Sequence, residues 1–282
     1  MEKRASILLE ALPYIQRFHG KTLVIKLGGS LIGDPNLIDS VCQDVVMLNF
    51  VGMKIVLVHG GGPEVSGEME RAGLKPKFVD GMRFTDDETM EIIHKSLVGK
   101  VNKSLVLGIS RHGGNVVGTS GIDGGLIRAK KVPKLGLVGK VEKVNPSVIE
   151  YLLNNGYIPV IAPLGVSSDG SSLNLNADAV AGELAAAMKA EKIILLTDVP
   201  GVLRDPKKRE SLISTLTVKK AVDMKKSGKI KDGMIPKIDA CIKAVKSGVK
   251  RAHIIEGTTE HSLLLEVLTQ GGIGTMIERG PK

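Results

Sequence analysis

The stretch V-I-K-L-G-G-S, Val24 to Ser30, is a β-branched run that ends in two glycines, and V-L-V-H-G-G-G-P, Val56 to Pro63, repeats the pattern. Each apolar run predicts a buried strand, and each glycine group leads into a helical pattern. Glycine has no Cβ, so its backbone N–H approaches an anion closely, and a helix N-terminus behind it adds a favourable dipole. Either group alone is also explained as a tight turn. Together they predict a phosphorylated ligand at the carboxyl ends of a parallel sheet.

The common nucleotide-binding signatures are missing from the chain. No G-x-G-x-x-G occurs, and Gly20-Lys21-Thr22 has Ile15 where a P-loop requires its first glycine. A strand also follows this tripeptide instead of preceding it. A nucleotide would therefore bind through another fold.

Length and composition set the class of protein. The 282 residues are 43% hydrophobic, enough for one large α/β domain or two closely packed lobes. No apolar run reaches the roughly 20 residues that span a bilayer, and the N-terminus lacks a signal-peptide pattern, so we expect a cytoplasmic protein without membrane contact. Cys42 and Cys241 lie far apart and predict buried thiols instead of a metal site.

The net charge is +9, and much of the excess lies between Lys207 and Lys231. Only 2% of the residues are aromatic, and no nucleic-acid-binding motif is present. We therefore expect no nucleic-acid partner. The basic stretch is read as a solvated face whose field also attracts ATP or a dicarboxylate.

Short β-branched runs alternate with helical patterns, which predicts a three-layer αβα sandwich with a central, mainly parallel sheet. We expect an N-terminal lobe over residues 21–175 and a C-terminal lobe over 176–282 that share this sheet. Residues 126–144 predict hairpins, and Thr85 with Glu88 predicts a capping box for one helix over 87–110. The expected strands are 22–27, 54–58, 115–118, 157–162, 192–197 and 251–256.

The first 20 residues stand apart as an extra N-terminal helix. Leu8, Leu12 and Ile15 recur at helical spacing, and Pro13 is expected to kink or break the helix. The segment precedes the first core strand. It either folds back on the domain or packs on another chain.

Two polar turns in the second half add candidate site residues. Asn174-Leu175-Asn176-Ala177-Asp178 exceeds what one helix cap needs, and the Asp178 carboxylate is placed to hold a lysine. Lys237 follows a turn into a helix, where the dipole disfavours a cation unless an anion or Asp178 lies beside it. The strand 192–197 ends in Thr197-Asp198 and Gly201, a turn suited to a nucleotide.

These segments, taken together, resemble the amino acid kinase family, and most closely its members that act on N-acetyl-L-glutamate. The motifs follow the family order over nearly the whole chain. They are K-L-G-G-S at 26–30, H-G-G-G-P at 59–63, G-M-R-F-T at 81–85, N-L-N-A-D at 174–178, L-L-T-D-V-P-G-V-L at 195–203 and G-M-I-P-K at 233–237.

The resemblance implies that ATP, carried with Mg²⁺, phosphorylates the side-chain carboxylate of N-acetyl-L-glutamate in arginine biosynthesis. Lys26 and Lys237 would stabilise the transferring group and Asp178 would orient them. No protein metal ligand is implied. The implied substrate-binding residues are Gly61, Gly62, Arg83, Asn174 and Asn176, and the implied phosphate and ATP residues are Gly28, Gly29, Thr197, Asp198 and Gly201.

The resemblance also implies regulation. Arginine-sensitive members carry a kinked N-terminal helix that joins dimers into a hexamer, a trimer of dimers, and residues 1–20 fit that role. The N-lobe would bind acetylglutamate and dimerise, and the C-lobe would bind ATP and sense L-arginine through Lys192, His253, Glu266 and Gly274. Two alternatives remain: a related kinase for carrier-protein-linked aminoadipate or glutamate, and a non-catalytic arginine-binding subunit.

Overall fold

A computed structural model describes residues 2–79, 81–231 and 233–280, with the backbone alone for residues 2–8. Within these residues the centre is an eight-stranded sheet, parallel except that β14 and β12 run opposite to the rest. The strands in spatial order are β12 (Thr215–Thr217), β14 (Thr275–Glu278), β13 (Arg251–Glu256), β11 (Lys192–Thr197), β1 (Thr22–Leu27), β2 (Lys54–His59), β8 (Ile158–Ala162) and β5 (Val116–Ser120).

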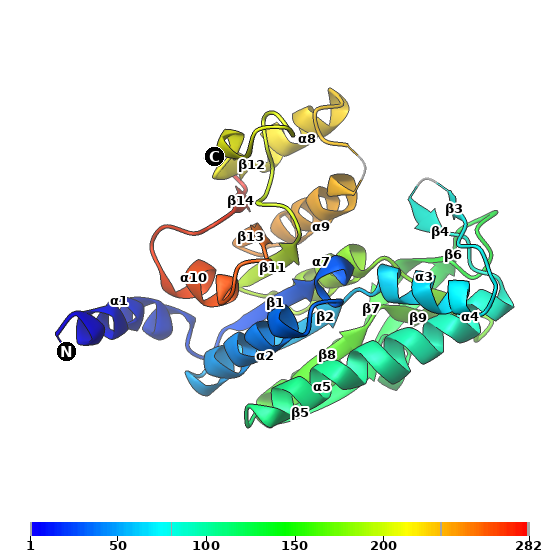
Figure 1. The fold of residues 1–282 in the computed structure, drawn as a ribbon, viewed down its shortest axis with the longest axis horizontal. Helices are drawn as coiled ribbons and strands as arrows, with labels where there is room; N and C mark the ends of the chain where they lie inside the picture. The colour runs from blue at the N-terminus through cyan, green and yellow to red at the C-terminus, as the bar shows by residue number, and fades with distance from the viewer. Residues whose placement is uncertain (1, 80, 232, 281–282) are drawn as a thin grey trace.

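Helices cover both faces of the sheet, which confirms the predicted three-layer sandwich (Figure 1). One face is covered by α6 (Ser147–Asn154), α7 (Ala177–Ala187), α8 (Val218–Lys226) and α9 (Met234–Lys246). The other is covered by α2 (Pro35–Phe50), α5 (Asn102–Arg111) and α10 (Ser262–Leu268). The four strands of the C-terminal half lie together on one side of this sheet and the four of the N-terminal half on the other. The halves meet where β11 pairs with β1, so they share one continuous sheet.

A smaller sheet lies beyond the carboxyl ends of β2 and β8, near α3 (Gly62–Arg71) and α4 (Asp87–Ile93). It contains β10 (Ser172–Asn174), β9 (Leu164–Val166), β6 (Ile127–Lys131) and β7 (Gly139–Val144). The antiparallel pairing of β6 with β7 confirms the expected hairpin. A short ribbon of β3 (Phe78–Val79) and β4 (Met82–Arg83) stands beside it.

Alternation along β1 decides where its lysine points. Leu23, Ile25 and Leu27 belong to the apolar core under α2 and α10, whereas Val24 belongs to the core under α7. Side chains alternate between the faces of a strand, so Lys26 emerges on the face of Val24, toward α7. The last residue of this face is therefore a cation at the carboxyl end of the central strand.

Three local predictions are wrong in detail. The expected single helix over 87–110 is α4 and α5 joined by a π-helix, His94–Val101. Asp86, not Thr85, caps α4, because its carboxylate accepts a hydrogen bond from Thr89 N at 2.9 Å. The elements α10, β12 and β14 near the C-terminus are missing from the predicted set, since they span seven, three and four residues and are too short to show a clear periodicity.

The N-terminal helix α1 (Glu2–Phe18) runs through Pro13 without a break. Phe18 is buried, and Tyr14 and Ile15 pack on the core beneath α2 and α10. Leu9 and Leu12 are 66% and 44% exposed, and the side chain of Leu8 lies outside the described residues. The first part of α1 projects from the body of the molecule (Figure 1). The C-terminal part of α1 therefore packs on the domain, whereas Leu9 and Leu12 leave apolar surface exposed.

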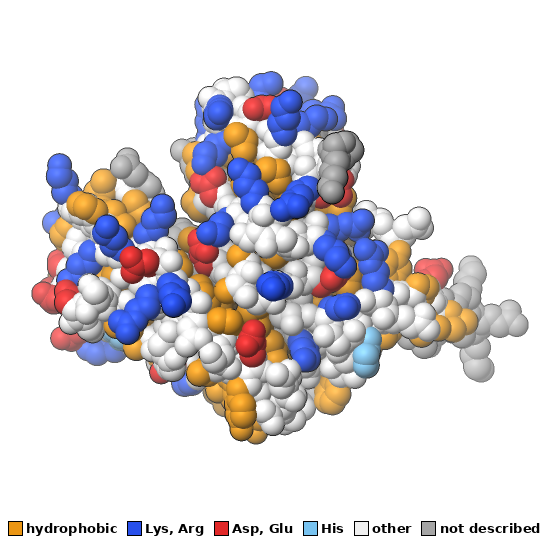
Figure 2. Space-filling model, turned by 180° about the vertical axis from the view of Figure 1, so that it is seen from behind, with side chains coloured by type: hydrophobic (Ala, Val, Ile, Leu, Met, Phe, Trp, Pro, Cys, Tyr) orange, Lys and Arg blue, Asp and Glu red, His pale blue; other side chains and the backbone are white. Residues whose placement is uncertain are grey.

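The buried cysteines and the basic surface of the structure (Figure 2) agree with what the amino-acid composition predicts. Cys42 and Cys241 are both buried free thiols, as predicted, and burial raises the pKa of Cys42 to about 12. Among the described residues, no helix combines the length and apolarity needed to cross a membrane. Lys and Arg side chains gather over the part of the molecule that includes α8 (Figure 2).

Candidate active site

The two glycine turns meet at the carboxyl ends of β1 and β2, which are neighbouring parallel strands. A Cβ on Gly29 would lie 2.9 Å from Gly61 N, and one on Gly60 would lie 3.0 Å from Gly29 N. Gly60 N donates to Leu27 O at 2.9 Å, which joins the second turn to the first strand. Any side chain at these positions would separate the turns, so the glycines bring two sets of backbone N–H groups to one place.

Two lysines and one aspartate form a buried cluster beside these turns. Lys26 Nζ lies 2.8 Å from Asp178 Oδ1, and Lys237 Nζ lies 3.6 Å from Asp178 Oδ2. The side chains of Lys26 and Asp178 are each 7% exposed, and that of Lys237 is 17% exposed. The three groups carry a net charge of +1. A buried excess of positive charge is costly, so the cluster favours an anionic ligand.

The first turns of two helices hold this cluster. Asn176 caps α7, because its Oδ1 accepts hydrogen bonds from Asp178 N at 2.9 Å and from Ala179 N at 3.1 Å. This cap fixes the backbone of Asp178 and leaves the two amide hydrogens of Asn176 for another partner. Lys237 lies in the first turn of α9 and donates to Gly233 O at 3.1 Å. The expected contact of Lys237 with Asp178 is present.

A cavity of about 210 Å³ adjoins the second glycine turn. Arg83, Asn174 and Asn176 contribute its polar lining, and Val65, Ile93 and Leu97 are among its apolar residues. Asn174 Nδ2 donates to the buried Thr85 hydroxyl at 3.2 Å, which in turn donates to Arg83 O at 2.9 Å. The predicted substrate-binding residues therefore line one cavity of a size suited to a small molecule.

Arg83 is buried and places its guanidinium in the wall of this cavity. Its Nη2 donates to Gly62 O at 2.9 Å and to Ser66 Oγ at 2.6 Å, and its guanidinium lies 4.8 Å from the Phe78 ring centroid. Burial lowers its pKa. None of the ion pairs found among the described residues includes Arg83. Its planar guanidinium suits bidentate binding of a carboxylate, so Arg83 is the candidate in this cavity for binding an acidic ligand.

We expect Arg83→Lys to raise the KM for a carboxylate substrate by about 10–100-fold, because one charge-assisted hydrogen bond contributes about 1.5–3 kcal/mol. The KM for ATP should change little. Steady-state kinetics with each substrate varied in turn measures both constants. Arg71→Lys, at the exposed end of α3, is the matched control. Equal effects on both substrates would contradict the assignment.

The predicted nucleotide residues lie at the end of β11, next to the first glycine turn. Gly28 N donates to Leu196 O at 2.9 Å, and a Cβ on Gly28 would lie 3.6 Å from Thr197 Cα. The Thr197 hydroxyl donates to the Asp198 carboxylate at 3.0 Å. Gly201 has φ +140°, and a Cβ there would lie 2.6 Å from Thr275 Oγ1. Packing against β14 therefore accounts for the glycine at this position.

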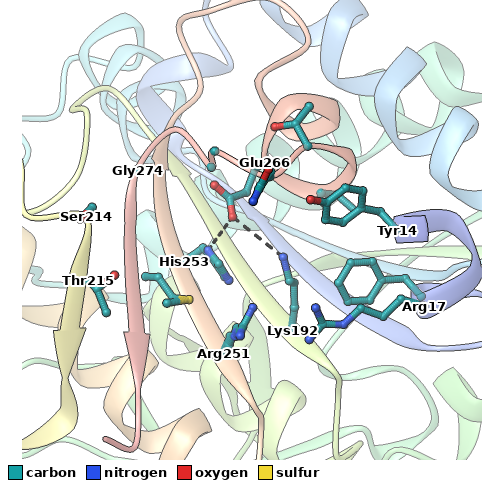
Figure 3. Close-up of a pocket in the computed structure, with 16 residues that line it drawn as sticks. Tyr14, Arg17, Lys192, Ser214, Thr215, Arg251, His253, Glu266 and Gly274 are labelled. Carbon is teal, nitrogen blue, oxygen red and sulfur yellow. Dashed lines mark ion pairs between the residues drawn. The ribbon is translucent and has the colours of Figure 1, made fainter. Parts of the chain in front are cut away.

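A second cavity, of about 470 Å³, lies between α1, α10 and the strands β11, β13 and β14 (Figure 3). Glu266 points into it, with Oε1 2.6 Å from His253 Nδ1 and 4.0 Å from Lys192 Nζ. Burial opposes ionisation of Glu266, but the His253 hydrogen bond and nearby positive charges bring its pKa below the ordinary value. Burial lowers the pKa of His253 and of Lys192. Gly274 also lines this cavity, so the four residues predicted for arginine sensing lie together.

Several lining residues of the two cavities are absent from the predicted set. Tyr14, Arg17 and Arg251 face the second cavity (Figure 3), and Phe78 lines the first. The helical spacing of α1 is the only signal for Tyr14 and Arg17, and it does not say what they face. Among the described residues, no group of three or more His, Cys, Asp or Glu side chains is arranged to hold a metal ion.

Two glycine turns at the carboxyl ends of neighbouring parallel strands, beside two lysines held by one aspartate, form an arrangement typical of phosphotransferases of α/β architecture. The chain belongs to the amino acid kinase family, whose model matches residues 21–256. Curated relatives match it over nearly the full length. The acetylglutamate kinase of Archaeoglobus fulgidus is 50% identical over 98% of this chain and 99% of its own length, and that of Caldanaerobacter subterraneus is 54% identical over 97% and 93%.

Solved structures share the fold. N-acetylglutamate synthase from Neisseria gonorrhoeae, complexed with coenzyme A and N-acetyl-glutamate, superposes with a TM-score of 0.87 at 25% identity, over 99% of this chain. This chain spans 64% of the synthase chain. Carbamate kinase from Giardia lamblia bound to AMP-PNP gives a TM-score of 0.70 at 19% identity, over 93% and 99% of the two chains. The second likeness concerns the fold alone.

Proposed function

We infer that the chain is an acetylglutamate kinase, which transfers the γ-phosphoryl group of ATP to the side-chain carboxylate of N-acetyl-L-glutamate. The observation that carries this inference is the buried cluster of Lys26, Asp178 and Lys237 beside the paired glycine turns. It provides positive charge and backbone N–H groups where a phosphoryl group in transfer needs both. The full-length match to acetylglutamate kinases supports the same reaction.

The reaction needs no general base. The attacking carboxylate has an ordinary pKa of about 4.3 and is ionised at neutral pH. One of its oxygens bonds to the γ-phosphorus while the bond from that phosphorus to the bridging oxygen breaks, which leaves an acyl phosphate and ADP. The protein therefore contributes positioning and charge stabilisation. Mg²⁺ enters with the ATP phosphates as part of the substrate.

Each residue then has a defined task. Lys26 and Lys237 neutralise charge on the transferring group, and Asp178 orients both ammonium groups. Gly28, Gly29, Gly61 and Gly62 donate backbone N–H groups to phosphoryl and substrate oxygens. Arg83 binds the α-carboxylate of the substrate, and Asn174 and Asn176 bind its other polar groups. We assign residues 21–175 to acetylglutamate and 176–282, with Thr197, Asp198 and Gly201, to ATP.

A kinase assay on free N-acetyl-L-glutamate tests this function. The acyl phosphate is trapped with hydroxylamine, and the hydroxamate is measured with ATP and Mg²⁺ present and with each omitted. Turnover without a carrier protein supports the proposal. Turnover only on a carrier-linked substrate would favour the related carrier-dependent kinase, for which the basic surface over α8 would be a docking face (Figure 2). ATP binding without turnover would favour a regulatory subunit.

We also propose that L-arginine inhibits the enzyme from the second cavity. Glu266 supplies a buried carboxylate for a guanidinium, and arginine would replace the contacts it now makes with His253 and Lys192. Tyr14 and Arg17 from α1 line the same cavity. Arginine bound in this cavity would change the position of α1 relative to α10. Because α1 is the element proposed to link subunits, this movement would pass from one subunit to the next.

The exposed apolar face of α1 leads to a prediction on assembly. We expect the full chain, acting in the cytoplasm, to form a hexamer in which α1 joins three dimers, because Leu9 and Leu12 are exposed on a helix that projects from the body. Deletion of residues 1–20 should leave dimers and weaken arginine inhibition. Light scattering after size-exclusion chromatography measures the mass.

A double substitution of Leu9→Ser and Leu12→Ser is the matched variant, since it keeps Tyr14, Arg17 and Phe18 in place. It should also yield dimers. A truncated chain that remains hexameric would contradict the role given to α1.

A further inference from the structure

His59 ends β2 immediately before the second glycine turn and has no part in the mechanism above. Its ring is fully buried. His59 Nδ1 lies 2.8 Å from Gly60 O, and His59 Nε2 lies 3.3 Å from Asn102 Nδ2. Asn102 is the first residue after the π-helix His94–Val101 and is also fully buried. A buried imidazole with a partner at each nitrogen holds one orientation.

Two backbone carbonyls fix which nitrogen carries the proton. Asn102 Nδ2 donates to Val160 O at 2.9 Å and lies 3.2 Å from Thr119 O. Carbonyl oxygens only accept hydrogen bonds, so the amide nitrogen of Asn102 must face β8 and β5. The two hydrogens of this amide are shared among the two carbonyls and His59 Nε2. The amide nitrogen has no capacity to accept a hydrogen bond, so His59 Nε2 beside it cannot carry the proton. The proton is therefore on Nδ1, which donates to Gly60 O.

The imidazole is also held neutral. Burial lowers the pKa of His59 to about 4. A second proton would place an N–H against the Asn102 amide nitrogen, so the geometry opposes protonation independently. Lys103 Nζ lies 3.5 Å from Asn102 Oδ1 and donates to it, which supports the placement of the amide oxygen on that side and of the amide nitrogen toward His59.

The hydrogen bond from His59 sets the orientation of the peptide between Gly60 and Gly61. In a trans peptide the C=O and the following N–H point in opposite directions. The carbonyl turned toward His59 therefore directs Gly61 N–H to the other side, where Gly29 lies. Gly60 N–H is already committed to Leu27 O at 2.9 Å, and none of the hydrogen bonds found among the described residues uses Gly61 N–H.

We propose that His59 is a positioning residue for phosphoryl transfer: as a neutral imidazole whose tautomer Asn102 selects, it aims Gly61 N–H at the transferring group. This rests on the proposed kinase function. Its effect is exerted through the peptide, and His59 itself exchanges no proton with substrate. A glycine at position 61 has φ +150° and no side chain to fix it, so an external hydrogen bond is the means of holding this peptide.

Two amide variants separate the contacts of the ring. His59→Asn places an N–H near the position of Nδ1 and keeps the bond to Gly60 O, whereas His59→Gln reaches the position of Nε2 and keeps only Asn102. We expect kcat to fall about 10–100-fold in His59→Gln. This is at most the fall caused by removing one hydrogen-bond donor to a developing charge, because Gly61 N–H is still present but no longer oriented. His59→Asn should retain most of kcat, and the KM for ATP should stay near that of the wild type in both.

The wild-type protein supplies a readout that does not depend on activity. Nitrogen NMR of the six histidines, with the His59 signals assigned in the wild type by correlation to its own backbone resonances, reports the tautomer directly. We expect a neutral Nδ1–H ring from pH 5.5 to pH 9. An Nε2–H ring, or a ring that titrates near 6.5, would overturn the proposal even if neither variant folds.

Kinetics add two further outcomes. Equal kcat in folded His59→Asn and His59→Gln, checked by thermal melts, would show a merely structural role. A limb in the pH profile of kcat near 6.5 that disappears in His59→Asn would show acid–base chemistry instead. Absence of turnover in the wild type would refute the proposed kinase function. The NMR result would then still establish the tautomer of His59, but the proposed role in phosphoryl transfer would fall with the function.

Discussion

Replacement of Lys26 by alanine should lower kcat by about 10²–10³-fold, the loss typical of removing one preorganised donor to a developing charge. Lys26 is 5% exposed at the end of the central strand, and a water molecule that entered the space left by its side chain would not supply the positive charge. Its charge matters most in the transition state, where negative charge spreads over the phosphoryl oxygens. The KM values for both substrates should therefore change less than kcat. The hydroxamate assay measures the rate.

The cluster itself complicates this variant, because Asp178 loses its 2.8 Å partner. Removing one member of a buried ion pair costs about 3–5 kcal/mol of stability when no other cation remains, but here Lys237 is still 3.6 Å away. Lys26→Met fills the space without the charge and should lose activity to the same extent. Lys21→Ala, at an exposed position before the same strand, is the control. Near-normal turnover in Lys26→Met would exclude the assigned role.

The central strands and the site at their carboxyl ends are readable from the sequence for one physical reason. A strand buried on both faces needs an uninterrupted apolar run, and Lys26 is an exception to that rule in β1. The expected bounds of β1, β11 and β13 coincide with those observed. Asp178 is predictable as a partner for a lysine because Asn174-Leu175-Asn176-Ala177-Asp178 carries more polar side chains than one helix cap needs, and the family resemblance implies that it orients Lys26 and Lys237.

Features that depend on contacts between segments are not readable in this way. A π-helix has nearly the same residue pattern as the α-helix around it, so His94–Val101 is visible only in the structure. Thr85 and Asp86 are both suitable caps by residue type, and the burial of Thr85 under Asn174 decides between them. Likewise, H-G-G-G identifies the turn but not the role of its histidine. That role depends on Asn102, which no local pattern connects to His59.

Replacement of Glu266 by glutamine should raise the arginine concentration for half inhibition by about 10–100-fold, because the guanidinium loses a charge-assisted pair of hydrogen bonds. Glutamine keeps the size of the side chain and an oxygen for the Ile273 N–H, which donates to Glu266 Oε2 at 3.1 Å. The loop that carries Gly274 should therefore stay in place. Inhibition is expressed as the ratio of rates with and without arginine for each variant.

Ligand analogues make this last experiment specific for the guanidinium. Citrulline has the same length as arginine but no positive charge, so the wild type should bind citrulline far more weakly than arginine. In Glu266→Gln the affinities for arginine and citrulline should be more nearly equal. Glu260→Gln, an exposed acid in the turn before α10, is the control for net charge. Calorimetric titration of each variant measures affinity apart from catalysis. Unchanged arginine affinity in Glu266→Gln would place the effector elsewhere, because no other carboxylate among the described residues lines this cavity.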